Sequence, residues 1–203
     1  LLNDYYTWNA SLIIQNISES TAAVTVTYST GYETLYSIEP KSNESIYLPH
    51  ETSLPSGSNG LFSAEITSDV DVVVMVNQSN VYNRGATYNG FLSGSTSVYV
   101  PEVMNNASNF SSSVVCQNIG DSPTQMQIEF FDDVSSTSES IPAGGTQIWY
   151  LPNESVSEGF DGSAIITSLD DEDIACIANR NMEEEPYFST SMDMFFSYNG
   201  VNQ

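Results

Sequence analysis

The two cysteines offer the clearest covalent chemistry in the sequence. Cys116 and Cys176 each lie among apolar residues of an expected strand, which predicts that both thiols face a core. A disulfide between them would close a loop of about 61 residues and stabilise the fold by about 4 kcal/mol in the chain-entropy account. The alternative is a pair of buried free thiols, which a reducing compartment would favour. The disulfide is the favoured alternative, because further features of the sequence, given below, are typical of proteins outside the cell.

Metal-binding chemistry has weaker candidates. A zinc site is not expected, because only one histidine, His50, is available to join the two cysteines. The acidic run DDED at 170–173 offers the hard oxygen ligands that Ca²⁺ prefers, with Asp170, Asp171 and Asp173 as candidate ligands. Because the Asp-x-Asp-x-Asp-Gly spacing is missing, a solvated hairpin tip is the simpler interpretation. A second acidic run, EEE at 183–185, follows the next expected strand. No cofactor is expected, and structural calcium is the one candidate that the sequence offers.

The residues needed for catalysis are not arranged in any familiar pattern. His50 follows Pro49 in an expected loop, with no serine or cysteine elbow beside it. Gly-x-Ser-x-Gly, His-Glu-x-x-His and a lysine placed for a Schiff base are all missing. Pairs of carboxylates, as in glycoside hydrolases, carry little information in a chain with 26 acidic residues. The sequence therefore predicts a protein that is not an enzyme.

Asparagine side chains offer a different chemistry, the acceptance of N-linked glycans. Chance predicts about 4 Asn-x-Ser/Thr triplets in a chain of this composition, so the number found is a modest excess. Most of the triplets fall at expected strand ends or turns, where a glycan can project into water; the bland alternative is ordinary turn residues. The candidate acceptors are Asn9, Asn16, Asn43, Asn77, Asn106, Asn109 and Asn153.

The charge balance excludes several classes of partner. The 203 residues carry 26 acidic side chains against three basic ones, for a net charge of −23. Three scattered cations cannot form a basic patch, so neither nucleic acid nor an anionic membrane surface is an expected partner. No apolar run approaches the roughly 20 residues that span a bilayer, so membrane insertion is not expected either. The chain begins at Leu1 without a leader, and we expect that a signal peptide has been removed.

Composition and periodicity predict an all-β fold. The chain is rich in serine, threonine and tyrosine and poor in the lysine and arginine that favour helices. Apolar and polar residues alternate at 24–28 and again at 126–130, the pattern of half-buried strands. Turn residues recur at the spacing of a sandwich. We therefore expect antiparallel, immunoglobulin-like β-sandwich architecture.

Internal similarity predicts two tandem domains. SLIIQN at 11–16 returns as SVVCQN at 113–118, and SAEITS at 63–68 returns as SAIITS at 163–168. Further ordered matches, given in pairs, are Pro40 with Pro142, SIYLP at 45–49 with QIWYLP at 147–152, VVVMVN at 72–77 with IACIAN at 174–179, and YNG at 88–90 with YNG at 198–200. Ordered matches of this kind predict an internal duplication. The expected domains are 1–95 and 96–203.

This repeated unit resembles the tandem β-sandwich repeats of secreted and surface proteins in filamentous Chloroflexota and related prokaryotes. The resemblance covers nearly the whole chain and rests on the motifs just given, which are structural. It implies an extracellular or cell-surface location and a wall, adhesion or filament role, with no attached enzyme activity. The chain is also similar in kind to archaeal extracellular threads and pili, which are glycosylated sandwiches joined by strand donation.

One strand is missing from one of the two copies. The segment 96–103 (TSVYVPEV) reads as a strand that could pair with either domain, and superposing the copies leaves it without a counterpart before Leu1. One domain should therefore keep an unpaired sheet edge, which a second copy could fill by β-augmentation. The residues expected to take part in assembly are Leu1, Leu2, Tyr5, Tyr6, Trp8, Val98, Tyr99 and Val100.

Two functions follow from these observations. The first is a structural subunit of an extracellular filament, sheath or surface layer, which binds copies of itself head to tail by strand complementation and carries N-linked glycans. The second is a monomeric extracellular adhesin or carbohydrate-binding module that uses exposed aromatic rings. The clustered aromatic residues at 5–8 lie beside the expected missing strand, which favours the first function.

Overall fold

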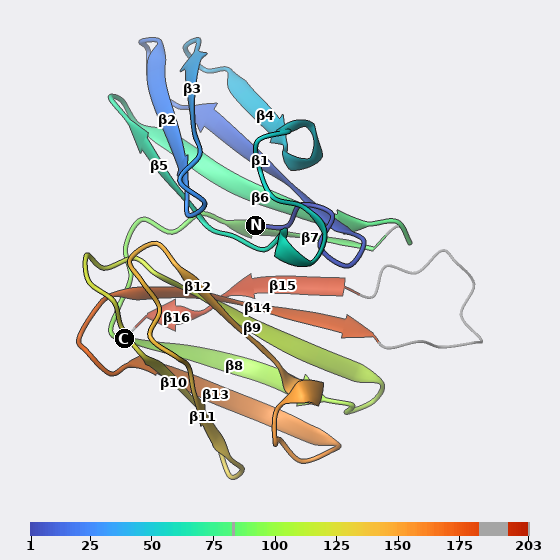
Figure 1. The fold of residues 1–203 in the computed structure, drawn as a ribbon. Helices are drawn as coiled ribbons and strands as arrows, with labels where there is room; N and C mark the ends of the chain where they lie inside the picture. The colour runs from blue at the N-terminus through green and yellow to red at the C-terminus, as the bar shows by residue number, and fades with distance from the viewer. Residues whose placement is uncertain (83, 183–194, 203) are drawn as a thin grey trace. The chain divides into compact units, whose positions relative to one another are not determined.

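The computed structural model describes residues 1–82, 84–182 and 195–202, and these are almost wholly β-structure (Figure 1). The chain separates into two compact units, Leu1–Gly90 and Phe91–Gln203, called unit 1 and unit 2 below. The predicted all-β class with antiparallel sheets is confirmed. The acidic run at 183–185 lies outside the described residues.

Unit 1 is built from two antiparallel sheets. Its elements are β1 (Trp8–Asn16), β2 (Ala22–Tyr28), β3 (Glu33–Ile38), β4 (Asn43–Tyr47), the 3₁₀ helices η1 (Leu48–His50) and η2 (Gly57–Asn59), β5 (Ala64–Ser68), β6 (Val72–Asn80) and β7 (Gly85–Asn89). One sheet has the order β4-β1-β6-β7 and the other β3-β2-β5. Alternate residues of both sheets form one core, which is sandwich-like. The alternation predicted for 24–28 is confirmed, because β2 buries every second residue.

Unit 2 is also built from two antiparallel sheets. Its elements are β8 (Ser97–Asn105), β9 (Phe110–Asn118), β10 (Met126–Phe130), β11 (Ser135–Thr137), β12 (Thr146–Tyr150), η3 (Leu151–Asn153), β13 (Phe160–Ser168), β14 (Ile174–Met182), β15 (Phe195–Asn199) and β16 (Val201–Asn202). One sheet has the order β12-β9-β14-β15 and the other β11-β10-β13-β8-β16. Its core contains the fully buried rings of Phe130 and Trp149.

The two units share one strand order with one addition. Adding eight to each strand label of unit 1 gives β12-β9-β14-β15 and β11-β10-β13, which are the orders found in unit 2. Unit 2 then continues from β13 to β8 and β16, whereas the sheet of unit 1 ends at β5 (Figure 1). The strand predicted at 96–103 is therefore β8, and the structure assigns it to unit 2.

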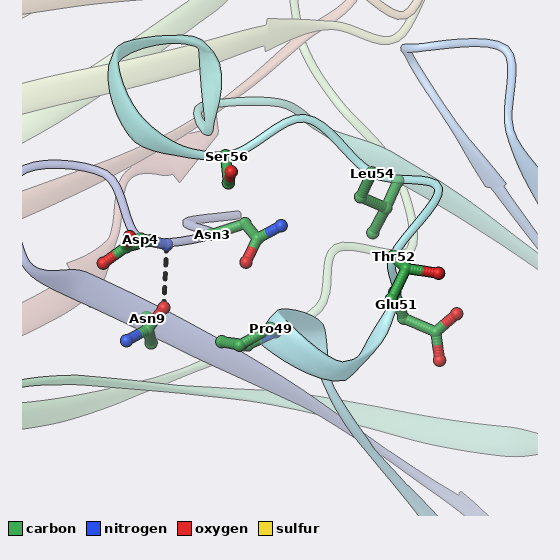
Figure 2. Close-up of a pocket in the computed structure, with 8 residues that line it drawn as sticks. All are labelled: Asn3, Asp4, Asn9, Pro49, Glu51, Thr52, Leu54 and Ser56. Carbon is green, nitrogen blue, oxygen red and sulfur yellow. Dashed lines mark hydrogen bonds between the residues drawn. The ribbon is translucent and has the colours of Figure 1, made fainter.

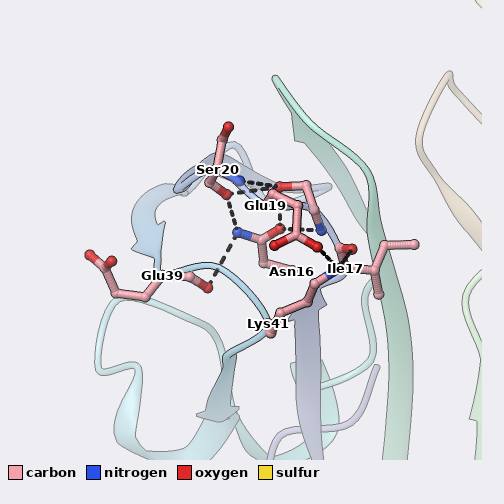
Figure 3. A network of polar contacts seen from close by, with 7 residues as sticks. Asn16, Ile17, Glu19, Ser20, Glu39 and Lys41 are labelled. Carbon is pink, nitrogen blue, oxygen red and sulfur yellow. Dashed lines mark hydrogen bonds and ion pairs between the residues drawn. The ribbon is translucent and has the colours of Figure 1, made fainter.

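A buried asparagine closes the same turn in each unit. The Nδ2 group of Asn16 at the end of β1 donates to the carbonyls of Ser20 (2.7 Å), Ile38 (2.9 Å) and Glu39 (3.3 Å) (Figure 3). Its counterpart Asn118 donates from Nδ2 to the Ser122 and Ile141 carbonyls at 2.8 and 3.1 Å. Each buried side chain therefore links the end of its strand to backbone carbonyls of two other segments of the unit. The repeated Gln-Asn motif is therefore structural.

A lysine binds the exposed side of the same turn in unit 1. Lys41 Nζ donates to the Ile17 carbonyl at 2.7 Å and lies 2.9 Å from a carboxylate oxygen of Glu19 (Figure 3). Both charged side chains are largely exposed, so the ion pair itself contributes little to stability.

Candidate assembly edge

Strands β5 and β13 are nearly identical in sequence and in their pairing on one side. β5 pairs with β2 so that Ile66 lies opposite Val26, and β13 pairs with β10 so that Ile166 lies opposite Ile128. The surrounding hexapeptides are SAEITS and SAIITS. The same strand therefore occupies the same position in both sheets.

The two strands differ on their other side. β13 pairs with β8, with Ile166 opposite Val98 and Ala164 opposite Val100. β5 has no strand on this side within the described part of the chain. The segment at 1–3 lies beside the residues just before β5 and is joined to them by an isolated antiparallel bridge between Leu2 and Leu61. The sheet of unit 1 therefore ends in an edge, which we call the β5 edge: residues Ala64–Ser68 and their outward backbone groups.

Three residues direct their backbone groups outward from the β5 edge. On the inner side, the Ser29 N–H donates to the Ser63 carbonyl (3.0 Å), and the Asp69 N–H donates to the Ala23 carbonyl (3.4 Å). Backbone groups alternate in direction along an antiparallel strand. The N–H and C=O groups of 64, 66 and 68 must therefore point away from β2.

The apolar side chains near the β5 edge are incompletely covered. Ala64 and Ile66 of β5, with Val72 and Val74 of the facing sheet, are only partly buried against the core of unit 1. Their counterparts in unit 2 are fully buried and are Ala164, Ile166, Ile174 and Cys176. The difference coincides with β8, whose fully buried Val98 and Val100 belong to the core of unit 2. Unit 1 therefore leaves apolar surface exposed where unit 2 has a strand.

The outer edge of β8 is protected in a way that the β5 edge is not. Pro101 interrupts it with a residue that has no N–H. The Glu102 N–H donates to the Tyr198 hydroxyl (3.3 Å), and the Met104 N–H donates to the Ser112 hydroxyl (3.0 Å). β16 pairs with β8 at Tyr99 and Val98. Few backbone groups along the outer side of β8 are therefore available to pair with another strand. The β5 edge is the better candidate for such pairing.

An arginine helps to hold β14 and β15 against β8. Arg180 Nη1 lies 2.7 Å from Glu102 Oε2, and the guanidinium stacks over the rings of Phe110 and Phe196 at 5.0 and 4.8 Å. The Tyr198 hydroxyl also donates to the Glu102 carbonyl. Burial raises the pKa of Tyr198 to about 12, so this hydroxyl keeps its proton to higher pH than an exposed tyrosine does. These contacts fix the strands around β8 in unit 2.

The predicted assembly residues fall into two groups. Leu1 and Leu2 are half-buried against the core of unit 1, and Tyr5 and Trp8 form a tight turn through paired backbone hydrogen bonds. Tyr6 in that turn is 72% exposed. An assembly role for this group stays a prediction.

The second group requires a correction. Val98 and Val100 are core residues of unit 2, so assigning them to a contact between molecules is wrong for this fold. Tyr99, which lies between them, faces outward and is 37% exposed. The sequence located the strand that has no counterpart, but it did not locate the strand of unit 1 that lacks a partner. The strand with no partner on its outer side within the described residues is β5, and the signal in the sequence was the pair of similar hexapeptides at 63–68 and 163–168.

The predicted disulfide is present. Cys116 and Cys176 lie directly opposite each other on β9 and β14, with their Cα atoms 4.1 Å apart, and both are fully buried. The bond therefore links neighbouring strands of one sheet. Unit 1 has Ile14 opposite Val74 at the equivalent position.

Two of the three candidate calcium ligands take part in hydrogen bonds within unit 2. Asp170 Oδ2 accepts hydrogen bonds from the Gln125 N–H (2.9 Å) and the Thr124 hydroxyl (3.3 Å). Asp173 contributes its backbone carbonyl to the Ile119 N–H (2.9 Å). In the part of the chain that the structure describes, no group of three or more His, Cys, Asp or Glu residues could hold a metal ion. Asp170, Asp171 and Asp173 are therefore not brought together as a calcium site.

The predicted glycan acceptors differ in accessibility. Asn43, Asn106, Asn109 and Asn153 are exposed, and the last of these ends η3. The amide oxygens of two half-buried candidates accept hydrogen bonds: that of Asn77 from the Thr87 hydroxyl, and that of Asn9 from the Asp4 N–H.

Asn16 must be removed from the candidate acceptors. Its residue is fully buried, and the Nδ2 atom that would carry a glycan donates to three carbonyls. A glycan there is incompatible with this fold. Ser18, the third residue of the triplet, donates from its hydroxyl to Asn16 Oδ1 at 2.8 Å, and the counterpart Asn118 makes the same kind of bonds from Nδ2 without an Asn-x-Ser triplet.

A shallow hollow in unit 1 is the other place where polar groups gather. It has a volume of about 380 Å³ and lies between the chain start and the loop after η1 (Figure 2). Its lining includes the amides of Asn3 and Asn9 and the carboxylates of Asp4 and Glu51. Nearby, the exposed His50 has its ring edge-to-face with that of Tyr47, at 4.9 Å.

Comparison with known proteins adds little. No protein-family profile and no curated protein matches the chain. The crystal structure of Thermotoga maritima 1070 is similar over 54% of this chain and 96% of its own length, with 14% identity and a TM-score of 0.42. A similarity at this level carries no argument about function. Within the described residues, no helix has the length and apolar character needed to cross a bilayer.

Proposed function

We propose that the chain is a structural, non-catalytic subunit of an extracellular filament, sheath or surface layer, which joins copies of itself head to tail through the β5 edge. The observation that carries the proposal is the contrast between β5 and β13. Nearly the same hexapeptide has a strand on both sides in unit 2 and on one side in unit 1, within the described residues. Adding a strand from another molecule would satisfy the outward backbone groups and cover the apolar side chains.

The extracellular location is supported by chemistry that suits the outside of a cell. A buried disulfide persists in oxidising compartments. A net charge of −23 favours solubility, because molecules of like charge repel one another. An internal duplication, in the sense of two related tandem β-sandwich domains, is supported by the shared strand order and by the equivalent buried asparagines.

N-linked glycans belong to the same proposal. The exposed candidates Asn43, Asn106, Asn109 and Asn153 lie at strand ends or in turns, where a glycan would not disturb a sheet. Mass spectrometry of native material should find added mass at these asparagines and none at Asn16. Unmodified peptides from all four exposed sites would contradict the glycan proposal.

Assembly can be tested with two matched variants. The unchanged chain should form larger species as its concentration rises, seen by sedimentation and as fibres or sheets by negative-stain microscopy. Ile66→Asp places a charge on the core face of the β5 edge and should abolish these species. Leu35→Asp places the same charge at a 75% exposed leucine on β3, the opposite edge of the same sheet, and should leave assembly intact. A chain that remains monomeric at every concentration would refute the proposal.

A second function has one observation in its favour, the polar hollow beside the chain start. Amides and carboxylates such as those of Asn3, Asn9 and Asp4 can hydrogen-bond sugar hydroxyl groups, which would suit a monomeric adhesin or carbohydrate-binding module. Tyr6 is the exposed ring on the adjoining turn. Dispersed particles with a positive glycan-array signal, lost in Asp4→Ala, would favour this function over assembly.

A further inference from the structure

The two units share a strand order but carry very different charges. Unit 1 has nine acidic side chains against two basic ones, for a net charge of −7. Unit 2 has seventeen acidic side chains against one basic one, for a net charge of −16. For bodies of similar size, the energy of repulsion among like charges rises with the square of the net charge. Unit 2 therefore has about five times the internal repulsion of unit 1.

The basic side chains of unit 2 cannot relieve this repulsion. Unit 2 has one basic side chain, Arg180, and its guanidinium is already paired with Glu102 at 2.7 Å. Sixteen further acidic side chains of unit 2 have no other basic side chain in their own unit to pair with. The cations that neutralise them must come from the solution.

Folding brings acidic segments of unit 2 together that are far apart in the sequence. Glu172 Oε2 accepts a hydrogen bond from the Ser122 N–H at 3.2 Å, which places the acidic turn at 170–173 beside a loop that carries Asp121. At the turn after β10, Asp133 Oδ2 accepts a hydrogen bond from the Ser157 N–H at 3.1 Å, in the acidic loop before β13. These segments move apart in the unfolded chain. The repulsion is therefore stronger in the folded unit and opposes folding.

The disulfide lies in the more highly charged unit. Cys116 and Cys176 cross-link β9 and β14 of unit 2, whereas unit 1 has Ile14 opposite Val74 at the equivalent position. A cross-link favours the folded state because it restricts the unfolded one, and it does so without removing any charge. The covalent bond thus offsets repulsion in the unit where repulsion is greater.

We propose that unit 2 is a salt-dependent folding unit, stabilised by diffuse screening of its carboxylates by dissolved cations, whereas the stability of unit 1 varies much less with salt. Screening acts over about 10 Å at 0.1 M salt and about 3 Å at 1 M, so repulsion across the unit weakens strongly over this range. The chain is then suited to surroundings of high salt, and dilution of the salt destabilises mainly unit 2. The inference goes beyond the proposed function and does not depend on self-association, because the repulsion acts within one molecule.

Urea unfolding of the full chain in 0.1 M and in 1 M sodium chloride, at protein concentrations where it is monomeric, tests the proposal. The fluorescence of Trp8 reports on unit 1 and that of Trp149 on unit 2. The variants Trp8→Phe and Trp149→Phe assign each transition. The urea midpoint of unit 2 should rise with salt about five times as much as that of unit 1. Equal rises in the two units, or no rise in unit 2, would overturn the proposal.

A charge-reduced variant separates the effect of charge from a general effect of salt. Four substitutions at exposed carboxylates change the net charge of unit 2 from −16 to −12: Asp121→Asn, Asp132→Asn, Glu158→Gln and Asp171→Asn. The salt-dependent rise of the unit 2 midpoint should then shrink by about 40%, while that of unit 1 stays the same. A variant that keeps the full rise would show that the carboxylates do not cause it. A rise that already saturates at micromolar calcium chloride would reveal a specific cation site and refute diffuse screening.

Discussion

β5 and β13 have nearly the same sequence but different surroundings. β13 has strands on both sides, and Ala164 and Ile166 are fully buried. β5 has one neighbouring strand within the described residues, and Ala64 and Ile66 are only partly buried. The comparison teaches that the sequence of a strand does not determine whether it forms an edge; the segment that reaches its other side does.

The disulfide should give the largest difference between the units. Replacing both Cys116 and Cys176 by alanine should destabilise unit 2 by about 4 kcal/mol and leave unit 1 nearly unchanged, since the bond lies wholly in unit 2. Each unit has one tryptophan, Trp8 or Trp149, so mutating one in turn assigns each fluorescence transition to a unit. Equal shifts of both transitions in denaturant would show that the units do not unfold separately.

The isoleucines at the centres of the two strands should give the next largest difference. Ile166→Ala should cost about 3 kcal/mol, because it opens a cavity in a fully enclosed core. Ile66→Ala should cost the monomer about 1 kcal/mol, because part of that side chain is already in water. Urea unfolding at concentrations where the protein is monomeric measures both values. Similar costs at the two positions would contradict the difference in enclosure.

Substitution of the buried asparagines should destabilise the two units equally, because both units contain the same hydrogen-bonded turn. Asn16→Ala and Asn118→Ala should each cost their own unit about 2 kcal/mol, because each removes several hydrogen bonds from a fully buried amide to backbone carbonyls. Chemical denaturation of the two variants provides the measurement. A loss confined to one unit would show that the motif has different roles in the two copies.

Alkaline pH should have the smallest effect. Burial raises the pKa of Tyr28 above its ordinary value of 10, and it raises that of Tyr88 to about 12. Both belong to unit 1, whereas unit 2 has Tyr198, whose pKa burial also raises to about 12, so unit 2 should show a smaller effect of the same sign. The unfolded chain ionises these tyrosines at lower pH than the folded chain does, so unit 1 should lose stability as pH rises from about 10 towards 12. Stability measured between pH 8 and 11.5 should fall in that window; constant stability would contradict the burial of the two hydroxyls.

Much of the fold could be predicted because local patterns determine it. Alternation located β2 and β10, and the apolar neighbours of Cys116 and Cys176 placed both thiols in one core. The sequence could not assign β8 to a unit, because its side of the boundary depends on long-range pairing with β13. The alternation of apolar and polar residues within one segment does not show which distant strand it pairs with.

The candidate site was harder to predict from the sequence than the fold. Asn16 belongs to an Asn-x-Ser triplet, and only its burial and hydrogen bonds show that it is structural. The sequence pattern suggests Val98 and Val100 for assembly because their strand has no counterpart in the first half of the chain. In the structure both are core residues, and the strand without an outer partner within the described residues is β5. Comparison of the two halves of the sequence shows that one strand has no counterpart. The sequence of β5 itself gives no sign that its outer side lacks a partner.

Residue-resolved amide hydrogen exchange tests the central claim most directly. In dilute solution the amides of Ala64, Ile66 and Ser68 should exchange rapidly, while those of Ala164, Ile166 and Ser168 are protected. As the concentration rises and the chains assemble, the first set should become protected and the second should not change. If the β5 amides are protected in the monomer, or still exchange rapidly in the assembled form, the β5 edge is not where copies of this chain join.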